Sequence, residues 1–537
     1  MPGLSGARGP GLPGVRRTRW TRPTRPTRRW GGRRVLAALL AAALVAVLVV
    51  AGARAVRWAS GGGTLPAQVL PADARAYLAV DLDPPAGQKL QVLRLLRSLP
   101  DGPGGDREDL RRAAYDLLAR GGGLDGVDWE RDVDPWLGDR VGVALRPPVA
   151  GGSGGPARAA APVRPVAALA VRDEDAARAA LGRLAGRGGG PGWVLLDGYA
   201  LLAPDQAQAE DAARAAQDRP LADDPGFASD VDALGGRGVA TAWAATAALA
   251  APALAAALDA SGASGGTAAG RALVTGADLA AAALGPRTAA VLRVDDGRPR
   301  LVARTSGGWA RPAGAAPPGL AGLPVGTAAA LAVHGLGGAL TAGWDRLVEE
   351  DPLVAGVLGG APGQRTAVED RLALELPAGL VPLAGEDLAL ALRPGGADGA
   401  ALRVRHPDPE GAGRALERLL ALAGRAGALP ERATTDGRLV VATTPSARGA
   451  LEVSGSTGPG AAAGPALGEE PRVAEALPRL EQAVAAAYVD LDGLAPPGGW
   501  APGSAPARLA GAFAAAGATL AVPAPGVLEL DLRLLPR

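Results

Sequence analysis

An uninterrupted apolar stretch near the N-terminus constrains this chain more than any other feature. Residues 35–53 are all Ala, Leu or Val apart from Gly52. As an α-helix, such a stretch would span roughly 28 Å, close to the thickness of the hydrocarbon core of a bilayer. A buried helix of a soluble domain fits less well, because such a helix rarely runs this far without a polar side chain. We therefore predict a transmembrane helix over 35–53.

The charges around this stretch predict its orientation. Residues 1–34 contain ten arginines, and the first acidic residue of the chain is Asp73. The positive-inside rule therefore predicts a plasma-membrane protein with one span, a cytoplasmic N-terminus and an extracytoplasmic bulk. The alternative is a cleaved signal peptide, since Ala51-Gly52-Ala53 resembles a cleavage site, although the apolar run is longer than a usual signal core.

The arginine-rich tail, 1–34, carries a short repeat. Residues 18–29 form four successive Thr-Arg-x triplets, a period that favours an extended, disordered chain. We expect the arginines nearest the membrane to contact anionic lipid headgroups. These are Arg28, Arg29, Arg33 and Arg34. The alternative is that the tail only sets the topology of the span.

The remaining composition excludes several classes of function. Twelve of the 56 basic residues lie at or before Arg57, whereas all 54 acidic residues lie beyond it. The larger part of the chain is therefore mildly acidic, and its charge gives no reason to expect nucleic-acid binding. With no cysteine and two histidines, disulfides and thiolate zinc sites are excluded. We expect no metal or other cofactor, and we expect His334 and His406 to be unrelated structural or surface residues.

The region beyond the membrane segment contains an internal duplication. Several segments match in the same order: 76–80 with 329–333, 137–147 with 384–394, 168–172 with 401–405, and Asp197-Gly198 with Asp436-Gly437. We predict two homologous tandem domains. The expected boundaries are a linker at 54–69, a first domain at 70–312, a Pro/Gly linker at 313–322 and a second domain at 323–537.

Local patterns predict an α+β fold of antiparallel-rich sheets with helices on one face. Residues 291–303 contain a hairpin with an Asp-Gly turn, and 414–422 show the apolar spacing of a one-faced helix. In 528–534, leucines alternate with charged residues, so we expect one buried and one solvated face. The expected aromatic anchors of the core are Trp136, Trp193, Trp243, Trp344 and Trp500.

Motifs that could carry chemistry are weak. Residues 151–155 match the pattern of a serine nucleophile elbow but lie in a Gly/Pro-rich linker, and 121–126 match a dinucleotide pattern without its strand-and-helix context. Asp81 and Asp83 place two carboxylates on one side of a strand end, as do Asp490 and Asp492. Such pairs can bind calcium or transfer protons, but they are usually solvated strand ends. We predict no catalytic residues.

One segment resembles a known family. Leu70-Pro71-Ala72-Asp73, Tyr77, 80–84, 86–89 and 93–97 are similar to the opening of an actinobacterial single-pass membrane protein family known only as a domain of unknown function. Residues 136–140 resemble its next recurring segment. The resemblance implies an envelope-facing protein and supplies no catalytic residues. It leaves open whether Asp81, Asp83, Gln88 and Lys89 mark a shared site or a strand-to-helix turn.

These observations favour a non-enzymatic, membrane-anchored module that binds or scaffolds a protein or lipid of the cell envelope. A carrier or chaperone for a hydrophobic envelope component is the second hypothesis, and a carboxylate-dependent hydrolase is the third. Lys89, the only lysine, lies near the start of a predicted helix, where a positive charge opposes the helix dipole. We therefore predict that Lys89 contacts Asp81 or Asp83.

Overall fold

The structure is a computed structural model. It describes residues 65–83, 111–112, 115, 127–147, 164–186, 190–236, 238–245, 286–306, 319–350, 369–370, 375–394, 399–422, 431–435, 437–453, 465–495, 499 and 505–537. The predicted tail, the predicted transmembrane helix, Gln88, Lys89, Trp500 and the two weak motifs at 121–126 and 151–155 lie outside these residues. No helix within the described ranges is long and apolar enough to cross a membrane.

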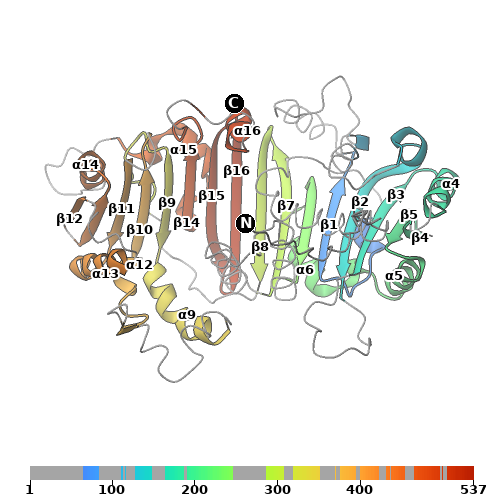
Figure 1. The fold of residues 1–537 in the computed structure, drawn as a ribbon, viewed down its shortest axis with the longest axis horizontal. Coiled ribbons are helices and arrows are strands. Elements are labelled where there is room, and N and C mark those ends of the chain that lie inside the picture. Colours follow the sequence, from blue (N-terminus) through green and yellow to red (C-terminus); the bar gives the residue numbers. More distant parts are fainter. Residues whose placement is uncertain are drawn as a thin grey trace, which may run out of the picture.

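The fold is dominated by one sheet of sixteen strands, in the order β12-β13-β11-β10-β9-β14-β15-β16-β8-β7-β6-β1-β2-β3-β5-β4. Neighbouring strands are antiparallel throughout. The sheet crosses the full width of Figure 1. The sequence predicts an α+β fold of antiparallel strands, and the structure has antiparallel strands with helices. The sequence also predicts two tandem domains, whereas the two halves of the structure share one sheet.

The first half contributes eight strands to this sheet. They are β1 (Ala76–Asp81), β2 (Leu137–Arg146), β3 (Arg164–Val171), β4 (Gly192–Leu196), β5 (Tyr199–Ala203), β6 (Ala240–Ala244), β7 (Arg287–Asp295) and β8 (Arg298–Ser306). Its helical elements are η1 (Pro66–Gln68), η2 (Trp129–Val133), α4 (Glu174–Ala185), α5 (Gln206–Asp218), η3 (Leu221–Asp223) and α6 (Pro225–Asp232).

The second half contributes the other eight strands. They are β9 (Ala329–His334), β10 (Asp387–Leu392), β11 (Ala400–Arg405), β12 (Glu431–Thr435), β13 (Arg438–Ala442), β14 (Ala483–Asp490), β15 (Phe513–Ala524) and β16 (Val527–Pro536). Its helical elements are α9 (Leu336–Glu350), α12 (Val381–Ala384), α13 (Pro409–Leu422), α14 (Pro445–Val453), η6 (Leu467–Glu469), α15 (Pro471–Ala476), η7 (Leu480–Gln482) and α16 (Ala505–Ala512).

Local sequence signals placed several of these elements correctly. The β7–β8 hairpin turns at Asp296-Gly297, whose φ angles of 51° and 78° are the left-handed values that a two-residue hairpin turn requires. The helix predicted at 414–422 is the larger part of α13. Trp136, Trp243 and Trp344 are buried as predicted, and Trp193 is half-buried.

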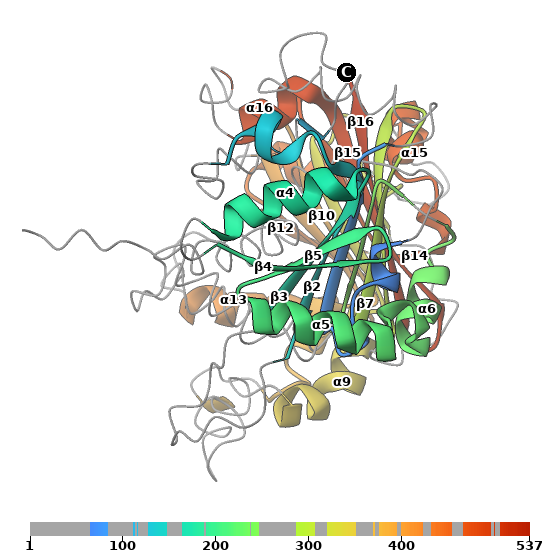
Figure 2. The ribbon, with the colours of Figure 1, turned by 90° about the vertical axis from the view of Figure 1, so that its right-hand side faces the viewer.

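Helices cover both faces of the sheet, so the prediction of helices on one face is wrong. Ala200 and Leu202 of β5 pack with Leu181 of α4 on one face, which we call the α4 face. Their neighbours Tyr199 and Leu201 pack with residues of α5 and α6 on the opposite face, the α6 face. Figure 2 shows α4 and α6 on opposite sides of the strands. Alternating strand residues are apolar on both sides here, so neither face is solvated.

The second half repeats this layering. Leu439 and Val441 of β13 pack with Ala412 of α13 on the α4 face. Val440 and Ala442 pack with residues of α14 and α15 on the α6 face. Counted outward from the centre, the strand order β8-β7-β6-β1-β2-β3-β5-β4 is matched by β16-β15-β14-β9-β10-β11-β13-β12. Each strand therefore occupies the same place in its half as its counterpart does in the other.

The two halves meet where β8 pairs with β16, and one charged residue of β16, Asp531, is buried there. Asp531 is 4% exposed, although the alternation of leucines with charged residues had predicted a solvated polar face. It lies opposite Val302, which belongs to the core on the α6 face. The prediction fails because β16 is a central strand with both faces covered, and alternation does not show which face is open.

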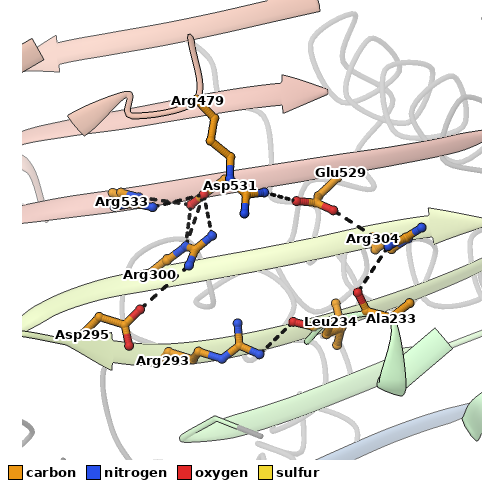
Figure 3. A network of polar contacts seen from close by, with 10 residues as sticks. All are labelled: Ala233, Leu234, Arg293, Asp295, Arg300, Arg304, Arg479, Glu529, Asp531 and Arg533. Carbon is orange, nitrogen blue, oxygen red and sulfur yellow. Dashed lines mark hydrogen bonds and ion pairs between the residues drawn. The ribbon is translucent and has the colours of Figure 1, made fainter. Parts of the chain in front are cut away.

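Asp531 is the centre of a polar network across the junction (Figure 3). Its carboxylate accepts hydrogen bonds from Arg300 Nη2 at 2.8 Å and Nε at 3.0 Å, and lies 3.4 Å from Arg533. Burial alone would raise the pKa of Asp531, but the hydrogen bonds and charges of the two arginines outweigh it and lower that pKa. Arg300 also lies 3.9 Å from Asp295, whose side chain is 50% exposed.

We predict that Asp531→Ala lowers the free energy of unfolding by about 3 kcal/mol, since it leaves the half-buried guanidinium groups of Arg300 and Arg533 without their shared, buried counter-ion. Asp295→Ala removes a half-exposed partner of the same Arg300 and should cost less than about 1 kcal/mol. Urea denaturation of the full chain in a non-ionic detergent measures both. Equal losses in the two variants would contradict the role assigned to Asp531.

The difference between wild type and Asp531→Ala should depend on pH. Because the pKa of Asp531 is lower in the folded chain, its contribution is present above the unfolded value of about 3.9 and is lost as the pH falls through the folded value. The stability gap should therefore narrow below about pH 4.

Candidate functional site

A cavity of about 380 Å³ lies on the α6 face of the first half. Strands β1 and β6 line one side of it, η1 and α6 contribute further walls, and Arg140 reaches it from β2. Most of the lining is apolar. The apolar side chains are Leu65, Pro66, Ala67, Tyr77, Ala79, Val80, Ala222, Phe227, Ala228, Val231 and Val239.

Three aromatic rings stiffen this region. The Phe227 ring meets Tyr77 edge-on, with ring centroids 5.2 Å apart, and meets Trp243 at 5.7 Å. Edge-to-face pairs add about 0.5–1.5 kcal/mol each beyond the area that they bury. Because Tyr77 and Trp243 lie opposite each other on β1 and β6, Phe227 fixes α6 against the sheet.

Three charged residues line the cavity: Asp81 and Arg140, which form an ion pair at one end, and the exposed Asp232 of α6. Arg140 Nε lies 3.2 Å from Asp81 Oδ2, and the two side chains are 9% and 14% exposed. The residues lie directly opposite each other on β2 and β1. Buried Tyr199 lies beside them on β5: burial raises its pKa to about 12, with Asp81 adding to the effect and Arg140 opposing it. Tyr199 is therefore a neutral hydroxyl at physiological pH.

Helix α6 is held against the sheet by Asp230. This carboxylate, in a residue only 5% exposed, accepts hydrogen bonds from Arg287 Nε at 2.7 Å, Trp243 Nε1 at 3.0 Å and Ser306 Oγ at 3.0 Å. Burial would raise the pKa of Asp230, but these hydrogen bonds and the charge of Arg287 outweigh it and lower that pKa. The cavity wall is thereby bonded to β6, β7 and β8.

Two glycines allow the walls to approach this closely. A Cβ on Gly142 of β2 would lie 2.3 Å from Pro66 Cβ, so only glycine lets η1 pack on the strand. A Cβ on Gly238 would lie 2.1 Å from the Leu292 carbonyl oxygen. Larger residues at these positions would push the walls of the cavity apart.

Asp81 and Asp83, which were predicted as a pair of acidic residues, lie in different environments. Asp81 lines the cavity, whereas Asp83 is exposed in the turn beyond the strand and donates its backbone N–H to Asp81 Oδ1 at 3.1 Å. Asp490 and Asp492 form the same local bond at 3.0 Å. The predicted contact of Lys89 with these carboxylates falls outside the described residues and stays a prediction.

The histidines lie in different settings. His334 Nδ1 lies 3.9 Å from Asp387, while His406 Nδ1 accepts a hydrogen bond from the backbone N–H of Asp408 at 3.0 Å. Among the described residues, no group of three His, Asp or Glu side chains could hold a metal ion. The arginines predicted to contact anionic lipid, Arg28, Arg29, Arg33 and Arg34, lie outside the residues that the structure describes.

Phe227 and Arg140 were not identified as site residues from the sequence. A signal for α6 was present, because Asp224 followed by Pro225 is a capping residue before proline at the first helical position. Asp224 does accept the N–H of Phe227 at 2.9 Å. No local pattern, however, indicates that this helix packs over β1, more than 140 residues earlier in the chain.

Comparison with known proteins identifies a family. Its model, described as "Protein of unknown function (DUF3352)", matches residues 35–488. The chain belongs to the DUF3352 family. The match begins at the first residue of the predicted transmembrane helix and runs into β14, so it includes the whole cavity lining. No curated protein matches the chain, and no solved structure does.

We predict that Asp81→Asn lowers the free energy of unfolding of this DUF3352 protein by about 2 kcal/mol, because it removes the charge that pairs with buried Arg140. Asp83→Asn changes an exposed residue two positions away and should stay within about 0.5 kcal/mol of wild type. Denaturant titrations of the full chain compare them. A loss in Asp83→Asn as large as in Asp81→Asn would refute the assignment.

Proposed function

We propose that this DUF3352 protein is a non-enzymatic, membrane-anchored binding protein of the cell envelope, and that the cavity on the α6 face of its first half holds a small, mainly apolar ligand. The observation that carries the proposal is the cavity of about 380 Å³ with largely apolar walls. This volume lies within the range of about 300–1,000 Å³ that is usual for small-molecule sites.

The charged end of the cavity limits the ligand further. Arg140 is already paired with Asp81, so an incoming anion would have to displace a carboxylate, and a cation would have to displace a guanidinium. Separating a buried ion pair is costly. A neutral ligand with one hydroxyl, amide or carbonyl group can instead bond to the pair without breaking it. The ligand class is therefore an uncharged amphiphile.

Binding of an apolar ligand agrees best with the carrier hypothesis. The scaffold hypothesis would be favoured by a flat acidic surface rather than an apolar cavity. The hydrolase hypothesis rests on Asp81 and Asp83, but Asp83 does not line the cavity. Of the two carboxylates that do, Asp81 is paired with Arg140 and Asp232 is exposed. The cavity therefore favours ligand binding over the scaffold and hydrolase hypotheses.

We also infer that the two halves arose by duplication. In addition to the strand order, hydrogen bonds outside the strands agree: Leu70 O accepts the N–H of Leu221, and Leu323 O accepts that of Leu467. Leu70 and Leu323 each stand six residues before the first strand of their half, which begins at Ala76 or Ala329. Two related units that share one sheet leave one half free to develop a binding cavity of its own.

The first test asks whether the cavity binds an apolar ligand. We predict that 2-naphthol, a neutral aromatic alcohol, raises the melting temperature of the full chain in dodecyl maltoside, because a ligand that binds only the folded state stabilises it. Ala79→Phe, which places a ring in the cavity, should abolish the shift. Ala179→Phe, on the exposed side of α4, should retain it and serves as the matched control.

Two outcomes would contradict the proposed ligand site. One is the absence of any shift in the wild-type chain. The other is an equal shift in Ala79→Phe and Ala179→Phe, which would mean that the alcohol acts through the detergent or another surface.

The second test addresses the proposed anchor. We propose that 35–53 spans the plasma membrane with the tail in the cytoplasm, and that Arg28, Arg29, Arg33 and Arg34 contact anionic lipid headgroups. The family match supports this, because it includes the apolar stretch from its first residue. Protease added to wall-stripped cells should digest the chain beyond Ala53 and leave an N-terminal tag protected. Protection of the C-terminal part would reverse the topology, and a mature N-terminus at Arg54 would indicate a cleaved signal peptide.

A further inference from the structure

A second, smaller cavity of about 190 Å³ lies in the second half, and its lining is chemically opposite to that of the first. Three of its seven lining residues are arginines, and one is acidic. The lining consists of Gly319, Gly322, Asp387, Ala389, Arg403, Arg405 and Arg438. The cavity therefore carries a formal charge of +2, although acidic residues outnumber basic ones beyond the predicted membrane segment.

The strand register concentrates this charge. Arg405 of β11 lies directly opposite Asp387 of β10 on one side and Arg438 of β13 on the other. Like charges directly opposite each other across strands are destabilising. Asp387 offsets part of this repulsion, since its Oδ2 lies 3.3 Å from Arg405 Nη2.

Arg403 adds a third positive charge on the same face. It is held in place by the loop before β9, donating to the carbonyl oxygens of Gly319 at 2.9 Å and Gly322 at 3.5 Å. Burial, and then the charge of Arg438, lowers the pKa of Arg403, while Asp387 opposes this shift. The chain thus holds half-buried Arg403 beside two other cations in one cavity.

The equivalent position in the first half lacks these arginines. Its β3–β5 ladder pairs Ala170 with Tyr199 where β11–β13 pairs Arg405 with Arg438, and it pairs Ala168 with Leu201 where the second half pairs Arg403 with Val440. The sheet itself therefore does not need arginine at these places. The loop also differs, because Gly319 stands four residues before Leu323, where Pro66 precedes Leu70.

Glycine at 319 keeps this cavity open to a ligand. A Cβ there would lie 3.2 Å from Arg403 Nη2 and 3.3 Å from Asp387 Oδ2, so any side chain would crowd both charged groups. The Gly319 N–H instead donates to Asp387 Oδ1 at 3.2 Å. The loop thereby orients the acid that holds Arg405 and leaves the arginine side of the cavity unfilled.

We propose that this cavity binds a phosphate-type oxyanion, held by Arg403, Arg405 and Arg438. Guanidinium groups bind such anions through paired, charge-assisted hydrogen bonds, and a dianion would neutralise the excess charge. The anion would come either from free phosphate or from the headgroup of an anionic phospholipid. The site is separate from the apolar cavity and does not depend on the function proposed for it.

Calorimetric titration of the full chain in dodecyl maltoside tests the site with two probes. The first is inorganic phosphate, and the second is dihexanoylphosphatidylglycerol, with dihexanoylphosphatidylcholine as the zwitterionic control. Arg405→Ala and Arg438→Tyr introduce the residues found in the first half and should each weaken binding by about tenfold or more. Affinity should also fall as sodium chloride is raised.

A matched control removes one arginine elsewhere in the same half. Arg414→Ala changes a 58% exposed side chain on α13 and should bind the probes as wild type does. Because Arg405 is itself 47% exposed, Arg405→Ala tests the site even if Arg438→Tyr disturbs folding. Binding of phosphate alone identifies a soluble anion, and binding of the anionic lipid alone identifies a headgroup.

Two results would overturn the proposal. The first is that neither phosphate nor the anionic lipid binds the wild-type chain. The second is that Arg405→Ala and Arg414→Ala weaken binding equally, which would show a general effect of surface charge.

Discussion

The pairing of β8 with β16 is the interaction on which the rest of this structure depends. Without it, each half would end in an exposed edge strand with unpaired backbone groups, a site prone to non-specific association. The ladder joins Arg300–Ser306 to Val527–Arg533 and merges the halves into one sheet. Buried Asp531 fixes its register, because a slip of one residue would turn this carboxylate to the α4 face, away from Arg300.

The same hairpin that forms this junction also positions the apolar cavity. Arg293 of β7 donates to the Leu234 carbonyl at 2.8 Å, and Arg304 of β8 donates to the Ala233 carbonyl at 3.3 Å. Both carbonyls lie at the C-terminal end of α6, where cations are favoured by the helix dipole. With Arg287 and Ser306 bonded to Asp230 within the helix, α6 is tied along its length to β7 and β8. The β7–β8 hairpin therefore both joins the two halves and holds α6 in place as a wall of the cavity.

The sequence predicted the elements whose signals are local. The Asp296-Gly297 turn, the strand at 528–534 and the helix within α13 follow from residues that are neighbours along the chain. The burial of Asp531 and the coverage of both sheet faces could not be predicted in this way, because they depend on which distant segments pack over each strand. The cavity could not be predicted either, because it forms where α6 meets β1 and β2, which are distant from it along the chain.

The strand pairing shifts one of the sequence matches between the two halves by two residues. The sequence had aligned 168–172 with 401–405, which places Ala170 with Arg403. In the ladders, Ala170 pairs with Tyr199 beside the Asp197-Gly198 turn, and the residue paired with Arg438 beside Gly437 is Arg405. Strand side chains repeat every two residues, so a shift of two keeps each residue on its face and leaves the apolar pattern intact. Periodicity alone cannot detect such a shift.

The two cavities occupy comparable places but differ in chemistry. Each lies on the α6 face near the end of the first strand of its half, where Asp81 pairs with Arg140 and His334 with Asp387. In the first half Arg140 is paired with Asp81, and the remaining lining is mostly apolar apart from Thr241 and the exposed Asp232, so a neutral ligand can bind without breaking the ion pair. In the second half arginines exceed acids, so the cavity is stabilised by a bound anion. A shared sheet allows this divergence, because the strands hold both frameworks in register while the loops and side chains at one strand end change independently.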